Sequence, residues 1–385
     1  MLVAVVGGNL QGVEATYLAH KAGWKVRVVD KNPNPPASGL CDFFIQADVT
    51  SGRLLSQIFK DVDLVIPALE DDDALLSLTC WSRDTGKPFA FDPGAYAISS
   101  SKLETAELFT QIGLAVPLPW PDCRFPVLAK PSKGSGSKGV RIFHDFDTLK
   151  RYFSPHFPPK GWVLQEYLPG SQHSLEVIGI PGKYHTLQVT DLYVDTNFDC
   201  KRVAAPSDLS SERIANFEKL SLAIAAALSL RGIMDVEVIL HEEKFKVLEI
   251  DARLPSQTPT TVYWSTGQNM VQTLAELFID NFKGMQSGAT AARGSIYEHI
   301  RVTSELLEIG GEHIMTGGGP LYVCKDFFGA DEAITNFAVG KTPWVATLII
   351  SGPDRSRALV KRNRILNEIM RKLGLKKIRD PIPAV

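Results

Sequence analysis

Several features are missing from this sequence of 385 residues, and each absence excludes a class of protein. No apolar stretch reaches the roughly 18 residues that a membrane-spanning helix needs, and no basic region precedes the apolar run after Met1. The five cysteines are scattered, with neither a Cys-x-x-Cys pair nor a histidine spacing typical of zinc sites. We therefore expect a cytoplasmic protein with reduced thiols.

An excess of charge of one sign is also lacking. The 41 basic and 43 acidic side chains are mixed along the chain and give a net charge of -2, which provides no broad basic face for nucleic acid. With 44% hydrophobic residues, a soluble protein of two or three domains is expected. We expect small-molecule substrates and no membrane or nucleic-acid partner, and the sequence leaves open whether the protein forms a homo-oligomer.

The first hundred residues alternate between strand and helix patterns. The run Leu2 to Val6 is typical of a strand, the turn at residues 7–12 interrupts it, and a helical pattern leads to a second strand that ends at Asp30. This alternation predicts a parallel sheet covered by helices. From Val127 the pattern changes to antiparallel strands, among them one from Tyr184 to Leu192. The predicted fold class is therefore α/β followed by α+β.

A loop rich in glycine and serine, residues 131–139, follows a strand that ends in Lys130. Small residues allow backbone amides, such as those near Ser137, to approach phosphate oxygens, and Lys130 would add positive charge there. The loop joins two strands, whereas a Walker loop opens a helix, so that motif does not fit. A flexible hairpin with incidental lysines is the alternative interpretation.

Other polar elements occur upstream and downstream of this loop. Lys102 begins a predicted linking helix, and Ser174 and Glu176 lie two apart on one strand, so their side chains share a face. The backbone of a strand end could contact an adenine edge, with a carboxylate to accept from donors; these four residues are Gln165, Glu166, Tyr167 and Leu168.

Three carboxylates are predicted to meet on one sheet face. Glu249 and Asp251 differ by two positions, and a hairpin closed by residues 241–244 brings Glu237 beside them. Oxygen ligands without histidine or cysteine favour Mg²⁺. A solvated acidic strand is the alternative, but Arg253 places a fixed positive charge directly after the carboxylates.

Together, Lys102, Lys130 with its loop, residues 165–168 and residues 249–253 resemble the ATP-grasp superfamily in the usual order. The resemblance implies two lobes that hold ATP behind a Rossmann-like preATP-grasp domain. It implies domains at residues 1–98 (preATP-grasp), 99–182 (small lobe) and 183–385 (large lobe). The usual metal motif ends in Asn where this sequence has Asp251.

A closer resemblance, to the ligases of pyrrolysine biosynthesis, is carried by five segments: residues 7–12, 29–33, 232–237, 250–259 and 296–299. These enzymes join 3-methyl-D-ornithine to the side-chain amine of L-lysine. The resemblance implies ATP and Mg²⁺ as cofactors, with 3-methyl-D-ornithine or D-ornithine and L-lysine as substrates. It also implies an acyl-phosphate intermediate, for which we expect Arg253 and Lys130 to be catalytic.

Amino-acid substrates carry both charges and need donors and acceptors. Glu70 follows a strand whose carboxyl end is the usual ligand edge of a doubly wound sheet, and the first turn of that sheet lies nearby. The expected substrate residues are Leu10, Gln11, Glu70, Arg253 and Ser256. Further candidates are Asp195, Asp199 and Gln257, whereas His299 is expected to be structural.

Other functions stay open at this point. The turn at residues 7–12 with Asp30 is also compatible with a hydride-transfer dehydrogenase, although the dinucleotide fingerprint is incomplete. A second nucleotide at Asp30, Asp48 and Val49 is a related option. Other ATP-grasp amino-acid or peptide ligases, a carboxylase-like purine enzyme and a nonenzymatic ATP-binding regulator are the remaining alternatives.

Overall fold

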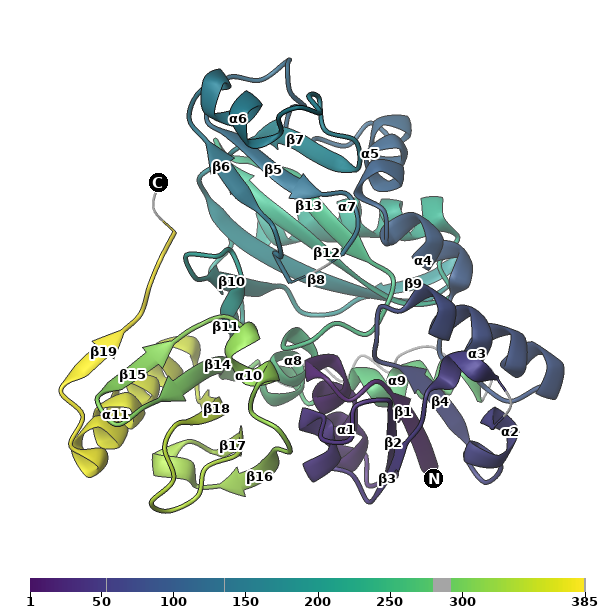
Figure 1. Ribbon diagram of the computed structural model, residues 1–385, viewed down its shortest axis with the longest axis vertical. Helices are drawn as coiled ribbons and strands as arrows, with labels where there is room; N and C mark the ends of the chain where they lie inside the picture. Colours follow the sequence, from purple (N-terminus) through teal and green to yellow (C-terminus); the bar gives the residue numbers. More distant parts are fainter. Residues whose placement is uncertain (53, 135, 280–291, 384–385) are drawn as a thin grey trace.

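The structure is a computed structural model that describes residues 1–52, 54–134, 136–279 and 292–383. Ser135 of the predicted loop and Asn281, the predicted end of a helix that begins at Asn269, lie outside the described residues. Figure 1 shows three parts, each built on its own sheet. None of the described helices is long and apolar enough to cross a membrane.

The N-terminal part is a four-stranded parallel sheet in the order β3-β2-β1-β4. Its central strands are buried valine-rich runs, as expected for a sheet covered on both faces. The predicted α/β unit is thus confirmed. Its elements are β1 (Leu2–Val6), α1 (Leu10–Lys21), β2 (Lys25–Asp30), β3 (Phe43–Gln46), α2 (Leu55–Ile58), β4 (Leu64–Pro67) and α3 (Asp72–Thr85).

Two helices then lead to a small antiparallel sheet in the order β6-β5-β7. Helix α4 (Pro93–Ser99) was not predicted from the sequence. Its N-cap residue Asp92 accepts hydrogen bonds from the amides of Gly94 and Ala95. The remaining elements are α5 (Lys102–Gln111), β5 (Val127–Pro131), β6 (Arg141–Phe143), α6 (Phe146–Tyr152) and β7 (Trp162–Glu166).

The third part is a sheet of 12 strands, whose main path is β13-β12-β8-β10-β11-β14-β18-β17-β16. Its first strands are β8 (Ser171–Ile180), β9 (Lys183–Thr186), β10 (Thr190–Val194), β11 (Cys200–Ala205), β12 (Gly232–His241) and β13 (Lys244–Asp251). The later ones are β14 (Gly294–Val302), β15 (Leu306–Ile309), β16 (Tyr322–Lys325), β17 (Glu332–Thr335), β18 (Trp344–Gly352) and β19 (Lys377–Arg379).

One predicted strand, Tyr184 to Leu192, is wrong because it is interrupted. β9 and β10 both pair with β8, but the register shifts between them, from Val177 opposite Thr186 to Ser174 opposite Thr190. This shift adds one residue to the outer chain, so regular pairing stops between the two strands. β8 itself lies inside the large sheet, and the domain boundary at residue 183 stays a prediction.

Helices cover the large sheet on one side at each end. α7 (Ser211–Leu228) packs its apolar residues on β8, β9 and β12, and α11 (Arg355–Leu373) packs on β14 and β18. Two further helices, α8 (Thr258–Thr266) and α9 (Met270–Phe278), contact α1 of the N-terminal part. A short helix, α10 (His313–Thr316), follows β15. The uncovered face of β8, β12 and β13 therefore points toward the other parts of the protein.

A group of charged side chains, here called the tail cluster, fastens the C-terminal end to the large sheet. Asp380, directly after β19, pairs with Lys201 at 2.6 Å and with Arg202 at 3.0 Å. Glu298 on β14 is fully buried and pairs with Arg202 at 2.5 Å and with Arg362 at 2.7 Å. Every member thus contacts at least one opposite charge.

Candidate active site

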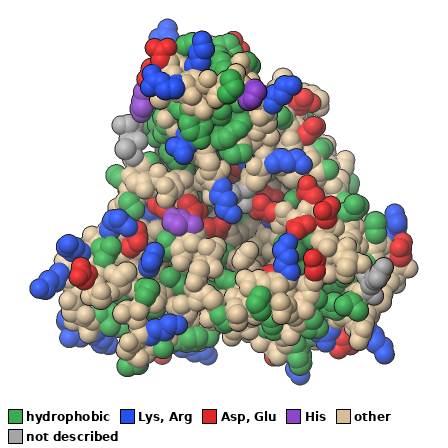
Figure 2. Space-filling model, viewed as in Figure 1, with side chains coloured by type: hydrophobic (Ala, Val, Ile, Leu, Met, Phe, Trp, Pro, Cys, Tyr) green, Lys and Arg blue, Asp and Glu red, His purple; other side chains and the backbone are tan. Residues whose placement is uncertain are grey.

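A cavity of about 700 Å³ lies where the three parts meet. Acidic side chains gather around the hollow at the centre of Figure 2. The lining includes ten aspartates and glutamates but only three lysines and arginines, so the cavity carries a strong excess of negative charge. The acidic members are Asp30, Asp48, Glu70, Asp71, Asp199, Asp235, Glu237, Glu249, Asp251 and Glu312.

The uncovered face of the large sheet forms the floor of this cavity. Glu237 lies opposite Glu249 across the β12–β13 hairpin, and Asp251 lies two residues further along the same face. The predicted meeting of these three carboxylates is therefore confirmed. Ser174 on β8 lies opposite Glu237, and Glu176 continues the next row.

Sequence reasoning missed Asp235, which completes that second row. It pairs in register with Glu176 on one side and with Asp251 on the other. Only 8% of Asp235 is exposed, and its Oδ1 has no hydrogen-bond partner within the described chain. The spacing of two residues between Asp235 and Glu237 was a signal that could have revealed it.

Crowding and burial change the acidity of these groups. Burial, and then the neighbouring carboxylate of Glu249, raises the pKa of Glu237 to about 7. Burial also raises the pKa of Glu176 to about 7, and burial followed by Asp251 raises the pKa of Asp235 well above its usual value. The ionised carboxylates therefore repel one another, and a cation bound between them would relieve this repulsion.

Two lysines reach the same floor from other parts of the chain. The Lys102 ammonium pairs with Glu249 at 2.9 Å and donates to the carbonyl of Gly134 in the glycine-rich loop at 2.7 Å. Lys130 is buried and donates to the carbonyl of Leu248 at 3.2 Å. Burial, and secondarily Lys102, lowers the pKa of Lys130. The structure thus brings both predicted lysines to one site with the carboxylates.

The glycine-rich loop closes over the cavity from the small sheet. Gly136 and Ser137 line the cavity, and the Ser137 hydroxyl donates to the carbonyl of Phe198 at 2.7 Å. Ser137 itself has a φ of 53°, and its glycine neighbour has a φ of 64°, a region that glycine adopts at little cost. This bond fastens the small lobe to the β10–β11 turn.

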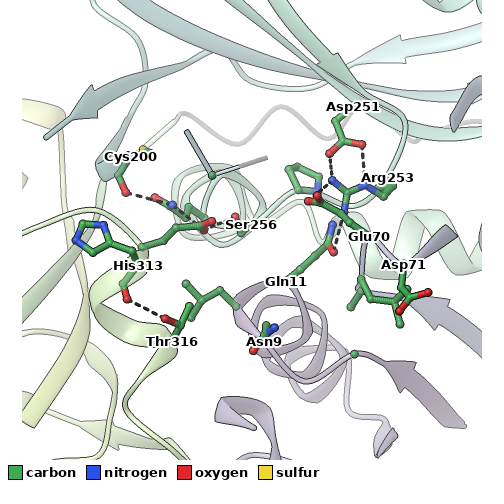
Figure 3. Close-up of a pocket in the computed structure, with 18 of the residues that line it drawn as sticks. Asn9, Gln11, Glu70, Asp71, Cys200, Asp251, Arg253, Ser256, His313 and Thr316 are labelled. Carbon is green, nitrogen blue, oxygen red and sulfur yellow. Dashed lines mark hydrogen bonds and ion pairs between the residues drawn. The ribbon is translucent and has the colours of Figure 1, made fainter. Parts of the chain in front are cut away.

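Arg253 occupies the junction between the large sheet and the N-terminal part, as Figure 3 shows. Its Nε donates to Asp251 at 2.8 Å, and its Nη2 contacts both Asp251 and Glu70, the latter at 2.8 Å. Its Nη1 donates to the Gln11 side chain at 3.1 Å. We call Arg253, Asp251 and Glu70 the cavity cluster. Predicted catalytic and substrate residues therefore meet here, and Leu10 lines the same cavity.

The predicted adenine segment lies at the end of β7, beyond the residues that line the cavity. Glu166 accepts from the Leu118 amide at 2.8 Å and contacts the Lys246 ammonium, so its carboxylate connects the small sheet to β13. The amide of Tyr167 donates to the Pro126 carbonyl at 3.0 Å. Gln165 pairs with Leu128 in the sheet, and Leu168 is buried. Adenine recognition by these residues stays a prediction.

The residues predicted for a second nucleotide also line the cavity, but their polar atoms have internal partners. Asp30 accepts from the Gly8 amide at 2.6 Å and from the Asn32 amide at 2.7 Å. Asp48 accepts from the amide and hydroxyl of Thr50, at 2.9 and 2.7 Å. Val49 is buried beside them. These bonds hold the loops after β2 and β3, and a second nucleotide stays a prediction.

The far wall of the cavity contains the predicted substrate residue Ser256 and the further candidates Gln257 and Asp199, together with Glu312. Ser256 donates to Glu312 at 2.8 Å, and Gln257 donates to the same oxygen at 3.3 Å. Asp199 accepts from the His313 amide at 2.9 Å, and Asp195 from the Gly311 amide at 2.9 Å. Sequence reasoning missed Glu312, because no regular spacing connects it to the other acidic residues.

His299 is fully buried and bonds Thr347 across β14 and β18 at 2.8 Å. Burial lowers the pKa of His299 to about 3, so it is neutral at ordinary pH. This arrangement agrees with the structural role expected from the sequence.

The carboxylate floor fits Mg²⁺ in its chemistry, because all its donors are oxygens and one buried oxygen of Asp235 lacks a partner. Within the described ranges, however, no three His, Cys, Asp or Glu side chains are grouped closely enough to hold a metal by themselves. The reason is visible in the contacts: Glu249 is turned to Lys102, and Asp251 is turned to Arg253. Phosphate oxygens would have to supply the remaining ligands.

Known proteins resemble this chain in sequence and in fold. Residues 99–257 match the model of an ATP-grasp domain. The chain is 34% identical to 3-methyl-D-ornithine–L-lysine ligase of Methanosarcina mazei, over 97% of this chain and 96% of the relative. It is 35% identical to the enzyme of the same name from Methanosarcina acetivorans, over 94% and 95% of the two chains.

Solved structures share the fold at low sequence identity. An ADP complex of N5-carboxyaminoimidazole ribonucleotide synthetase gives a TM-score of 0.70 at 14% identity, covering 95% of this chain and 96% of that one. An L-amino acid ligase from Bacillus licheniformis gives a TM-score of 0.68 at 18% identity, covering 95% and 97%. The predicted ATP-grasp fold is therefore confirmed.

Proposed function

Because this chain belongs to the ATP-grasp superfamily and, within it, to the family of 3-methyl-D-ornithine–L-lysine ligases, we propose that it joins 3-methyl-D-ornithine to the side-chain amine of L-lysine in pyrrolysine biosynthesis. It is an ATP-dependent amide-forming ligase. The observation that carries the proposal is that Lys102 and Lys130 both reach the carboxylate floor, which lines the same cavity as Arg253.

ATP occupies the cleft between the small and large sheets in this proposal. Lys102 and Lys130 offset the charge of its phosphates, and amides near Ser137 approach the phosphate oxygens. Glu237, Glu249 and Asp251 would hold Mg²⁺, which neutralises charge on the β- and γ-phosphates when bound. Ser174 and Glu176 complete this nucleotide side.

The first chemical step is phosphorylation of the substrate carboxylate. A carboxylate oxygen attacks the γ-phosphorus while the bond to the ADP oxygen breaks, giving an acyl phosphate and ADP. Arg253 stabilises the charge that develops, because its planar guanidinium suits carboxylate and phosphate oxygens. Its partners Glu70 and Gln11 keep the guanidinium oriented from the N-terminal part.

The second step forms the amide. The unprotonated side-chain nitrogen of lysine attacks the acyl carbon, phosphate leaves, and the nitrogen loses a proton. Positioning supplies most of the rate enhancement in such a mechanism, so no nucleophilic side chain of the protein is required. Leu10, Gln11, Glu70 and Ser256 line the cavity where the amino acids would bind.

The test is incubation with ATP, Mg²⁺, L-lysine and either 3-methyl-D-ornithine or D-ornithine, followed by mass spectrometry. The expected result is one condensed product and one ADP for each amide formed. Omitting lysine should abolish the product. ATP hydrolysis that depends on bicarbonate, without condensation of amino acids, would instead indicate a carboxylase-like enzyme. Background ADP with every amino acid offered would contradict the ligase proposal.

A further inference from the structure

Within the described residues, one carboxylate oxygen of Glu312 accepts hydrogen bonds from side chains and the other has no such partner. Ser256 and Gln257 both donate to Oε2, at 2.8 and 3.3 Å. Oε1 faces the glycine-rich loop, where a side-chain carbon added to Gly136 would lie 3.7 Å from it. The side chain is therefore oriented by two donors while its second oxygen points along the cavity toward that loop.

The negative charge of Glu312 has no cation beside it. Among the described residues, no lysine, arginine or histidine forms an ion pair with it, and His313 beside it in the chain pairs with Asp199 instead. Burial, followed by Asp199, raises the pKa of Glu312. Glu312 is partly buried, and a partly buried carboxylate without a cation is unfavourable, so binding of a positively charged ligand group here would lower the free energy.

If the proposed function holds, the position of the glycine-rich loop indicates which positively charged group of the substrate would bind Glu312. The loop covers the phosphates of ATP, so the carboxylate to be phosphorylated must lie beneath it, beside the γ-phosphate. In an amino acid the α-ammonium is attached to the carbon next to that carboxylate. An acceptor close to Gly136 is thus well placed for the α-ammonium of the activated substrate.

A metal ion fits Glu312 less well. Its Oε2 already accepts two hydrogen bonds, and the described chain offers no set of three metal-ligating side chains around it. An ammonium group needs fewer ligands and can be bound by one oriented carboxylate oxygen.

We propose that Glu312 is a specificity-determining residue, which binds the α-ammonium of the amino acid whose carboxylate is activated, beneath the closed glycine-rich loop. Ser256 and Gln257 are positioning residues that orient it. The inference rests on the proposed function and extends it to the choice between amino acids and their uncharged analogues.

The test compares D-ornithine with 5-amino-2-hydroxypentanoate, in which a hydroxyl replaces the α-ammonium, by product formation with saturating lysine and ATP. The wild-type protein should prefer D-ornithine by about 100-fold in kcat/KM, as expected when a buried charge loses its partner. Glu312→Gln should reduce that preference to less than about fivefold, with the KM for ATP within about twofold of wild type.

Two further variants separate this role from a general structural one. Glu312→Asp retains the charge and should restore part of the preference, and it serves also if Glu312→Gln is poorly folded. Glu305→Gln, on the exposed surface nearby, should leave the preference unchanged. Product formation with an unchanged preference in both Glu312 variants would overturn this inference alone. Absence of any condensed product from the wild-type protein would overturn the proposed function, and this inference with it.

Discussion

Two groups of charged side chains, each built around a buried arginine, contact the same large sheet, but they differ in charge balance. In the tail cluster three cations face two acids, and the acids Glu298 and Asp380 each contact more than one cation. In the cavity cluster one arginine, Arg253, must serve Asp251 and Glu70, and beyond them Asp235 has a buried oxygen without a partner. A cluster in which every acid is paired with a cation stabilises the fold, whereas a cluster with unpaired negative charge can bind a cationic ligand.

Breaking the tail cluster should give the largest effect, on stability. Glu298→Gln removes the only fully buried charge that Arg202 and Arg362 share, and it should lower the free energy of unfolding by about 3 to 5 kcal/mol. Urea denaturation measures this change. Glu368→Gln, in an exposed pair on α11, is the matched control and should cause no measurable change. Equal stability of both variants would show that the tail cluster contributes little.

Breaking the cavity cluster should act on turnover instead. Arg253→Ala should reduce ADP release by about 100- to 1,000-fold, because the developing charge loses its donor, with ATP affinity nearly unchanged. An ADP-release assay and nucleotide titration check both points. Unchanged turnover would contradict the role given to Arg253.

Glu14 on α1 offers an intermediate case, a buried acid that has hydrogen-bond donors but forms no ion pair within the described part of the chain. It accepts from the Thr260 amide at 2.6 Å and from the Tyr297 hydroxyl at 3.3 Å, and burial raises its pKa to about 7. The folded protein therefore holds a proton that the unfolded chain releases near pH 4.5. Its contribution to stability is complete below about pH 4.5 and is lost as pH rises through about 7.

Glu14→Gln should remove this loss, which is at most about 3 kcal/mol. Relative to wild type, the variant should become more stable as pH rises from 5 to 8, as followed by urea denaturation at each pH. A difference between the two proteins that does not change with pH would show that Glu14 is ionised in the folded protein throughout this range.

The smallest expected effect concerns the contact that closes the cavity. Ser137→Ala removes the hydroxyl that bonds Phe198, a neutral hydrogen bond worth about 1 kcal/mol. The KM for ATP should rise by roughly fivefold at most, with stability unchanged. Steady-state kinetics measures this, and Thr110→Ala, which removes an exposed hydroxyl that bonds within α5, is a suitable control. A larger rise in the control would assign the change to something other than loop closure.

Local patterns in the sequence predicted most of what lies on regular elements. The spacing of Glu249 and Asp251, and the hairpin that brings Glu237 beside them, follow from strand periodicity alone. Lys102 and Lys130 were placed in one site because their motifs, taken in order, resemble those of a superfamily, and the contacts with Glu249 and Leu248 agree.

Residues brought together by long-range packing could not be predicted in the same way. Glu312 meets Ser256 only because α10 packs against β14 and β18, and no pattern in its own segment indicates that contact. The interruption between β9 and β10 depends on a one-residue shift in register, which alternation of apolar residues does not reveal. The domain boundaries and the roles of the adenine segment stay predictions.

The continuity of the large sheet limits how this enzyme can move. The strands from β13 to β18, on which the floor carboxylates and the tail cluster lie, are joined edge to edge by backbone hydrogen bonds. Changing the distance between Asp235 and Glu298 would require those bonds to break or the sheet to bend. The two other parts that line the cavity, the N-terminal part and the glycine-rich loop of the small sheet, are not joined to this path of strands, so adjustment to substrates of different length is expected to involve them.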